Sequence, residues 1–234
     1  MAAKRFQGIA ACVFDAYGTL FDVGAPARRL EQGLGGSATA VSELWRSKQL
    51  QYTWLRSLMG RHADFWRVTG DALDYALLAH GIRDARLRGR LMREYLTLDA
   101  YPDARHALAR LKGAGIKCAI LSNGSPRMLR AVVKHAGLAH FFDAVLSVEE
   151  VGIYKPHPKV YRLAVARLKV PAPRIAFQTA NAWDAAGAKA FGFRVAWINR
   201  AGGRLERLPG KPDAELASLA ELPALIGIER ARTP

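Results

Sequence analysis

Two kinds of apolar pattern alternate along most of the chain. Short continuous runs rich in β-branched and aromatic residues predict five buried strands, over Ile9–Tyr17, Ile116–Asn123, Ala144–Val148, Arg174–Ala180 and Arg194–Asn199. Helical spacing predicts four helices between the later strands, over Asp103–Lys112, Pro126–Ala136, Pro158–Leu168 and Trp183–Phe191. Because strands and helices alternate across short turns marked by glycine or proline, we predict an α/β fold with a parallel sheet and helices on both faces.

Residues 23–99 interrupt this alternation. They hold no convincing strand pattern, but the segments 42–60 and 62–81 show apolar residues at helical spacing. We therefore predict an all-helical insertion after the first strand. On this interpretation residues 1–22 and 100–234 form a core domain, and residues 23–99 form a helical cap domain.

The composition is that of an ordinary folded protein. A chain of 234 residues, half of them hydrophobic and 24% charged, can bury one sizeable core together with a smaller appended domain. No apolar run approaches the roughly 20 residues that a membrane span needs, and the first residues pass straight into a strand pattern without a secretion signal. We therefore expect a cytoplasmic protein with no membrane partner. Cys12 and Cys118 lie in strand-like stretches, which favours buried thiols over a disulfide or a metal site.

The formal net charge of +15 has two interpretations. One is attraction of anions, either a small acidic substrate or a nucleic acid, and the other is a surface suited to solubility. The basic residues are scattered along the chain, and no motif of a nucleic-acid-binding protein accompanies them. We therefore favour the second interpretation, expect no nucleic-acid partner, and expect only a modest attraction of small anionic substrates.

Polar residues gather just after four successive strands of the predicted sheet. In an open parallel sheet, ligands bind at the carboxyl ends of the strands. The residues at these positions are Asp15, then Ser122 and Asn123, then Lys155, and then Asn181 and Asp184. Four such clusters in one chain are hard to obtain by chance, so we predict a functional site at this edge of the sheet.

Five segments resemble those of the haloacid dehalogenase superfamily. Three are typical of the superfamily as a whole: FDAYGTLFDV (14–23), AILSNGSP (119–126) and YKPHPKVY (154–161). Two others, LWRSKQLQYTWLRSLMGR (44–61) and NAWDAAGAKAFGF (181–193), are similar to its L-2-haloacid dehalogenases. The resemblance implies a Rossmann-like core with a helical cap, hydrolysis of a carbon–halogen bond, and no cofactor or metal.

The resemblance also implies a mechanism. Asp15 is then a nucleophile that displaces halide from C2 of an (S)-2-haloalkanoic acid, with inversion, and forms an ester that water hydrolyses to an (R)-2-hydroxy acid. Lys155 keeps Asp15 ionised and stabilises charge on the ester carbonyl. Arg46 matches the dehalogenase arginine, which receives the departing halide or grips the substrate carboxylate.

The remaining candidates have supporting roles. Thr19 and Ser122 orient the Asp15 carboxylate or the substrate carboxylate by hydrogen bonds. Asn181 and Asp184 position and activate the water, and Asp184 instead, or also, pairs with Lys155. Asn123 joins Arg46 around the halide, and the Tyr161 hydroxyl supports Lys155. Thr179 supplies a further hydroxyl. The apolar pocket for the substrate consists of Tyr17, Leu50, Phe65 and Trp183. Ala180 departs from the serine that relatives generally carry, which weakens the expected water-holding network.

Two other functions compete with this one. Phosphatases of the superfamily need a second acid two positions after the nucleophile, as well as carboxylates that hold Mg²⁺. Here that position is Tyr17, and a departing halide needs no proton, so a Mg²⁺-dependent phosphatase or phosphonatase is the alternative rather than the preferred function. A non-enzymatic anion or nucleic-acid binder would leave the residues at the strand ends unexplained.

A homodimer is the expected assembly. The predicted cap helices carry more apolar surface than a small core needs, in Trp54, Leu55, Leu58 and Met59. The family resemblance implies the same assembly.

Overall fold

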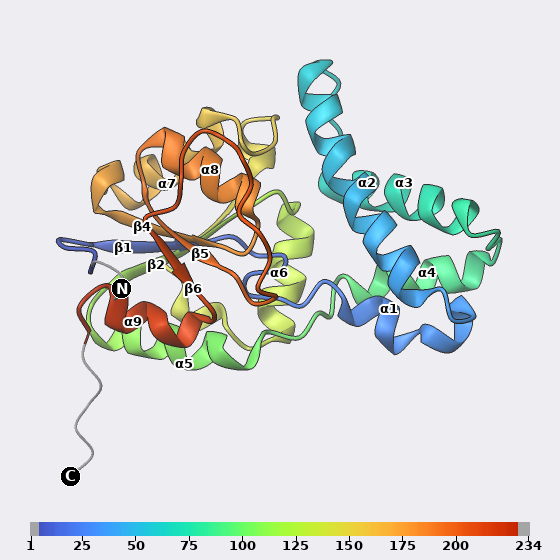
Figure 1. Ribbon diagram of the computed structural model, residues 1–234, viewed down its shortest axis with the longest axis horizontal. Helices are drawn as coiled ribbons and strands as arrows, with labels where there is room; N and C mark the ends of the chain where they lie inside the picture. Colours follow the sequence, from blue (N-terminus) through green and yellow to red (C-terminus); the bar gives the residue numbers. More distant parts are fainter. Residues whose placement is uncertain (1–4, 229–234) are drawn as a thin grey trace, which may run out of the picture.

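A six-stranded parallel sheet lies at the centre of the computed structural model, which describes residues 5–228 (Figure 1). Its strands are β1 (Ala11–Phe14), β2 (Lys117–Ser122), β3 (Ala144–Ser147), β4 (Ile175–Thr179), β5 (Arg194–Ile198) and β6 (Ala214–Leu216). Their order is β3-β2-β1-β4-β5-β6, and every neighbouring pair is parallel. The predicted α/β fold is confirmed.

The position of β1 determines where a ligand can bind. Strand β1 pairs with β2 on one side and with β4 on the other, so the strand order reverses beside it, and this is where ligands bind in open parallel sheets. All four residues of β1 are buried. A strand that is covered on both faces has a continuous run of apolar residues in its sequence, as β1 does.

The structure differs from the predicted strands in two ways. The first strand ends at Phe14 rather than Tyr17, because the chain turns sharply directly after it, where the backbone N–H groups of Leu20 and Phe21 both donate to the carbonyl of Ala16. Strand β6 was not predicted, because its three residues are too few to show a periodic pattern.

Helices cover both faces of the sheet. They are α5 (Pro102–Gly113), α6 (Pro126–His135), α7 (Pro158–Leu168), α8 (Ala182–Phe191) and the short α9 (Leu222–Leu225). Figure 1 shows α5 and α9 on one face and α7 and α8 on the other. Short 3-10 helices lie in the connections: η1 (Glu31–Leu34), η2 (Ala139–Phe141), η3 (Val148–Glu150), η4 (Ala172–Arg174) and η5 (Leu219–Glu221).

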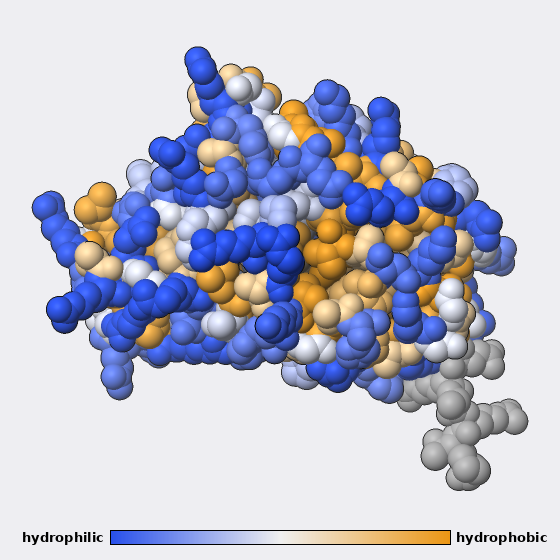
Figure 2. Space-filling model, turned by 180° about the vertical axis from the view of Figure 1, so that it is seen from behind, coloured by the Kyte–Doolittle hydropathy of each residue, from blue (hydrophilic) through white to orange (hydrophobic). Residues whose placement is uncertain are grey.

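Four helices between β1 and β2 form a second lobe, which we call the cap. They are α1 (Ala25–Arg29), α2 (Ala38–Leu58), α3 (Phe65–Ala79) and α4 (Ala85–Glu94). The carboxylates of Asp64 and Asp84 accept backbone N–H bonds at the starts of α3 and α4, as helix N-terminal caps do. Seen from behind, apolar side chains gather near the middle of the face, while hydrophilic side chains project from the cap (Figure 2).

The two cysteines are buried thiols, as the sequence predicts. Cys12 in β1 and Cys118 in β2 are neighbours across the sheet, and neither forms a disulfide. Burial raises the pKa of both thiols above their ordinary value, which makes them poor nucleophiles. In the part of the chain that the structure describes, no helix is long and apolar enough to cross a membrane.

Candidate active site

Asp15 is the first residue after β1, at the carboxyl edge of the sheet. Its backbone N–H donates to the carbonyl of Gln178 in β4 at 2.9 Å, which extends the strand pairing by one residue. The following turn contains Gly18 at φ +90°, a conformation that side chains other than glycine rarely adopt. The turn and the sheet together place the Asp15 side chain, which is only 6% exposed.

Three side chains donate hydrogen bonds to the Asp15 carboxylate. Lys155 Nζ reaches Oδ1 at 3.1 Å, while Asn181 Nδ2 and Thr19 Oγ1 reach Oδ2 at 2.9 Å and 3.3 Å. The donors come from the loop after β3, the start of α8 and the turn after β1. A carboxylate held at both oxygens cannot rotate freely, so its orientation is set before any ligand arrives.

Lys155 lies between two carboxylates. Its Nζ is 3.1 Å from Asp15 Oδ1 and 2.9 Å from Asp184 Oδ2, and its side chain is 1% exposed. The Tyr161 hydroxyl donates to Asp184 Oδ1 at 2.8 Å. We expected this hydroxyl to support Lys155 directly, but it contacts Asp184, and any support for the lysine passes through that carboxylate.

Burial and charge act in opposite directions on this cluster. Burial alone lowers the pKa of Lys155, but the charges of Asp15 and Asp184 outweigh it and leave that pKa above its ordinary value. The ammonium therefore stays charged across the neutral range. Burial raises the pKa of Asp184, and Lys155 opposes this shift without cancelling it. A carboxylate whose pKa is raised in this way is a stronger base near neutral pH than an exposed aspartate.

Arg46 reaches the site from α2 in the cap. Its Nη2 donates to Asn181 Oδ1 at 3.1 Å, and its Nη1 donates to Gln49 Oε1 at 2.7 Å. The Asn181 amide thus joins the arginine of the cap to Asp15 of the core. Our sequence reasoning did not include Gln49. Its position three residues after Arg46, on the same side of a predicted helix, was the available signal.

Three other predicted residues support the loops rather than the Asp15 carboxylate. Ser122 Oγ accepts the backbone N–H of Gly124 at 3.1 Å, and Thr179 Oγ1 accepts that of Asn181 at 3.1 Å. Asn123 Oδ1 accepts the backbone N–H of Lys155 at 3.2 Å. These bonds fix the loops that carry the polar side chains of the site. Ser122 has no described contact with the Asp15 carboxylate, and its expected contact with a substrate carboxylate stays a prediction.

Two pairs of aromatic rings join the core to the cap. The ring centroids of Tyr17 and Phe65 are 5.8 Å apart, and those of Trp183 and Trp54 are 5.3 Å apart. Each pair joins a core residue to a cap residue. The buried Tyr17 hydroxyl has no hydrogen-bond partner among the described residues. Leu50 lies one turn beyond Arg46 on α2 and is half-buried.

Ala180 contributes to the site through its backbone N–H and carbonyl groups. The Ala180 N–H donates to Thr19 Oγ1 at 2.8 Å, and Thr19 in turn donates to Asp15. The Ala180 carbonyl accepts the indole N–H of Trp197 at 3.2 Å. These bonds do not depend on the side chain, so alanine here leaves the orientation of the Thr19 hydroxyl intact.

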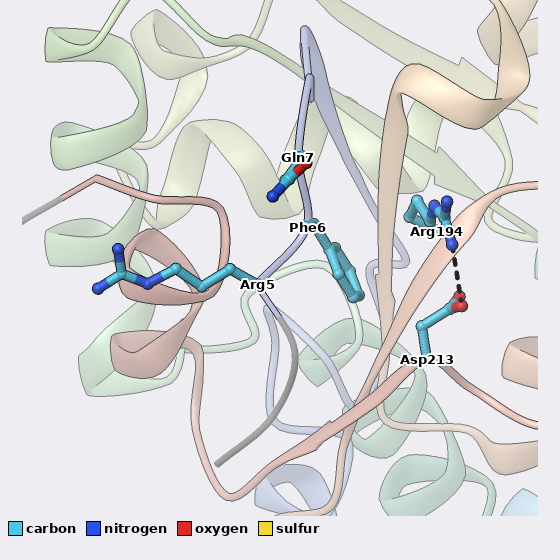
Figure 3. Close-up of a pocket in the computed structure, with 5 residues that line it drawn as sticks. All are labelled: Arg5, Phe6, Gln7, Arg194 and Asp213. Atoms are coloured by element: carbon cyan, nitrogen blue, oxygen red, sulfur yellow. Dashed lines mark hydrogen bonds and ion pairs between the residues drawn. The ribbon is translucent and has the colours of Figure 1, made fainter.

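A cavity of about 270 Å³ lies at the opposite edge of the sheet, away from Asp15. Figure 3 shows its lining, which consists of Arg5, Phe6, Gln7, Arg194 and Asp213. These residues lie at or before the starts of strands, and the Asp213 carboxylate already pairs with Arg194 and with Lys189. Over residues 5–228 there is also no group of three His, Cys, Asp or Glu side chains placed to hold a metal ion.

Comparison with known proteins agrees with this geometry. The family model described as haloacid dehalogenase-like hydrolase matches residues 9–192. This chain belongs to that family. It is 47% identical to (S)-2-haloacid dehalogenase 1 of Pseudomonas sp. (strain CBS-3) and 45% identical to (S)-2-haloacid dehalogenase 4A of Burkholderia cepacia. The matches cover 93% and 92% of this chain, and 96% and 94% of those proteins.

The structural likeness extends to a complex. L-2-haloacid dehalogenase from Xanthobacter autotrophicus superposes with a TM-score of 0.87 at 41% identity, over 94% of this chain and 100% of that one. A second structure of that protein has chloropropionic acid covalently bound, and superposes with a TM-score of 0.86 over the same shares of the two chains, also at 41% identity. The fold and the family that the sequence resemblance implied are confirmed.

Proposed function

We propose that this chain is a hydrolase of carbon–halogen bonds that converts small (S)-2-haloalkanoic acids to (R)-2-hydroxy acids. The observation that carries the proposal is the buried Asp15 carboxylate, held by Lys155, Thr19 and Asn181 at the carboxyl edge of the sheet. The covalently bound chloropropionic acid of the Xanthobacter autotrophicus enzyme supports an intermediate of the same kind here.

In the first step, Asp15 attacks C2 of the substrate. An oxygen lone pair forms the new C–O bond while the C–halogen bond breaks on the opposite side, so the configuration at C2 inverts and an ester forms. A carboxylate is a weak nucleophile in water because it is well solvated. Here burial removes most of that water, and the three fixed donors aim the oxygens.

Arg46 stabilises negative charge as the halide leaves. A guanidinium has five N–H donors, and the bonds to Gln49 and Asn181 use two of them, which leaves others for the halide or the substrate carboxylate. Asn123, which is 6% exposed, joins Arg46 around the halide. The side chains of Tyr17, Phe65, Trp183 and Leu50 accommodate the alkyl group and the halogen.

In the second step, water attacks the carbonyl carbon of the Asp15 ester. Asp184 takes a proton from that water with the help of Asn181. The bond between the carbonyl carbon and the product oxygen then breaks, and the product oxygen takes up the proton that Asp184 had accepted, which gives the 2-hydroxy acid. The oxygen that accumulates charge lies near Lys155, whose ammonium stabilises it. The raised pKa of Asp184, caused first by its burial, suits it to accept the proton.

Tyr17 distinguishes this reaction from phosphoryl transfer. An alcohol leaving a phosphate needs a proton, and the phosphatases of the superfamily place an acid two positions after the nucleophile. The phenol at this position has its pKa raised by burial, so it is a weaker acid than usual. Since a halide leaves without a proton, the residue suits dehalogenation and not the Mg²⁺-dependent alternative.

The first test is halide release from L- and D-2-chloropropionate in the presence of EDTA. We expect release from the L enantiomer alone, at a rate that EDTA does not change, because the proposed steps use only side chains of this chain. Inversion is checked by chiral chromatography of the lactate formed. Phosphatase activity that depends on added Mg²⁺, without halide release, would replace this proposal by the alternative.

We also propose the domain limits and location expected from the sequence. Residues 1–22 and 100–234 form the core domain, residues 23–99 form the cap domain, and the protein is cytoplasmic. The two crossings between lobes run side by side, because the backbone N–H of Asp22 donates to the carbonyl of Asp99 at 3.1 Å, which supports a boundary at these points.

The protein is proposed to be a homodimer through the end of α2. Leu58 is 85% exposed and Met59 63%, and Figure 1 shows this end of α2 projecting beyond the rest of the cap. An apolar surface of this kind is costly in water and is covered when two copies associate. We expect sedimentation at micromolar protein to give twice the mass of one chain, and Leu58→Asp to give one. A monomeric wild type would contradict the proposal.

A further inference from the structure

Arg46 is held by a chain of buried hydrogen bonds that links two cap helices. Arg46 Nη1 donates to Gln49 Oε1 at 2.7 Å, and Gln49 Nε2 donates to Thr69 Oγ1 at 2.8 Å. The Thr69 hydroxyl donates to the carbonyl of Phe65 at 2.6 Å. Gln49 and Thr69 are both fully buried, so no water competes for their polar atoms.

The donors and acceptors along this chain are complementary. A guanidinium only donates, so Gln49 must present its oxygen to Arg46. The Gln49 amide nitrogen then needs an acceptor. Thr69 Oγ1 accepts this bond and donates its own O–H to the Phe65 carbonyl. Because donors and acceptors match at each step, the chain restricts the position of the atom at its end, here Arg46 Nη1.

The far end of the chain is itself fixed. The indole N–H of Trp45 donates to the backbone carbonyl of Thr69 at 2.8 Å, so Thr69 is bonded to α2 twice, through Gln49 and through Trp45. Trp45 is 2% exposed, and its ring lies 4.9 Å from that of Tyr95. Thr69 is therefore a firm anchor for Gln49.

We propose that Gln49 is a positioning residue for the reaction, which acts through Arg46 and is held in turn by Thr69. This inference rests on the proposed function, in which Arg46 stabilises the departing halide. Without the Gln49 oxygen, Arg46 keeps the bond from Nη2 to Asn181 but loses the bond from Nη1, and one bond alone does not fix the orientation of the guanidinium. An arginine has a long flexible stem, so a shift of about 1 Å at its end is enough to lower a rate by about 100-fold.

Gln49→Met tests the inference, because methionine has a similar size and shape but offers no amide. We expect kcat/KM for L-2-chloropropionate to fall about 10- to 100-fold. Most of the loss should lie in kcat, because the halide carries its full charge only as the C–halogen bond breaks. Bromide, titrated by tryptophan fluorescence, should bind several-fold more weakly than to the wild type.

Thr69 offers a matched pair of variants. Thr69→Val removes the hydroxyl at nearly constant shape and should reproduce the loss of kcat in part, while Thr69→Ser retains the hydroxyl and should restore it. Thermal unfolding of each variant shows whether the fold survives at the assay temperature. A purely structural role for Thr69 would lower stability in both variants without a corresponding loss of kcat.

A double-variant cycle with Arg46→Lys decides whether Gln49 acts through Arg46. Once the guanidinium is gone, Gln49→Met should lower kcat far less than it does in the wild type. An equal loss in both backgrounds, or a Gln49→Met enzyme with wild-type kcat and bromide affinity, would overturn the inference. If the wild type releases no halide, the proposed function fails instead, and unchanged bromide binding in Gln49→Met would then refute the positioning role separately.

Discussion

Asp15→Asn is expected to abolish halide release from L-2-chloropropionate, with a loss on the order of 10⁴-fold or more. The amide has the shape of the carboxylate but lacks its negative charge, so its oxygen is a far weaker nucleophile toward carbon. The surrounding structure should persist, because Lys155 keeps its bond to Asp184 at 2.9 Å. Halide release under saturating substrate measures the loss.

A matched variant and a mass measurement accompany this prediction. Asp22 lies in the segment after the same turn, and its carboxylate pairs with Arg28 at the surface, so Asp22→Asn should keep the wild-type rate. Rapid acid quenching of the wild type should yield a peptide in which the Asp15 carboxyl carries the added mass of the 1-carboxyethyl group from 2-chloropropionate, absent from Asp15→Asn. An Asp15→Asn enzyme that retains a tenth of the wild-type rate would refute a nucleophilic role.

The fold could be predicted because its signals are local. Each of the five predicted strands is a largely apolar run of a few residues, and each of the four predicted core helices shows its own periodicity. Once the alternation of strands and helices is recognised, the parallel sheet follows, and the carboxyl ends of its strands meet at one edge. This is why Asp15 and Lys155 could be placed together although 140 residues separate them.

The hydrogen-bond partners of the side chains within the site could not be predicted in the same way. Tyr161 contacts Asp184 instead of Lys155, and Ser122 contacts the backbone of Gly124. Both outcomes depend on side-chain rotamers and loop turns, which no periodicity encodes. The role of Arg46 was assigned by family resemblance, because its contact with Asn181 depends on how the two lobes pack.

The hydrogen bonds from Arg46 through Gln49 to Thr69 show most clearly what could not be predicted from the sequence. Gln49 occupies an ordinary position of an amphipathic helix, and a glutamine there is usually an exposed residue. Only the packing of α2 against α3 reveals that it is fully buried and opposite Thr69. A contact between two helices is a long-range property, and a single sequence does not specify which faces meet.

Lys155→Met is expected to have the second large effect, on stability as well as on activity. The ammonium lies between two buried carboxylates, and its removal leaves Asp15 and Asp184 without their cation. Breaking a buried ion pair at one partner costs about 3–5 kcal/mol. Urea unfolding at pH 7 measures this loss, and halide release should fall with it because charge on the ester carbonyl is no longer stabilised.

The dependence of this loss on pH identifies its cause. Without the lysine, burial and the charge of Asp15 raise the pKa of Asp184 in the folded protein above that of the unfolded chain. The folded state then binds more protons than the unfolded state, so the stability of the variant rises as the pH falls. We therefore expect the deficit relative to wild type to be smaller at pH 5 than at pH 7.

A surface lysine supplies the control for Lys155→Met. Lys189 also pairs with an aspartate, Asp213, but its side chain is 31% exposed, so Lys189→Met should cost no more than about 1 kcal/mol and leave halide release unchanged. The contrast isolates burial as the cause, since both variants remove one lysine from an ion pair. A Lys155→Met protein as stable as the Lys189→Met protein at pH 7 would show that the two carboxylates do not depend on the ammonium between them.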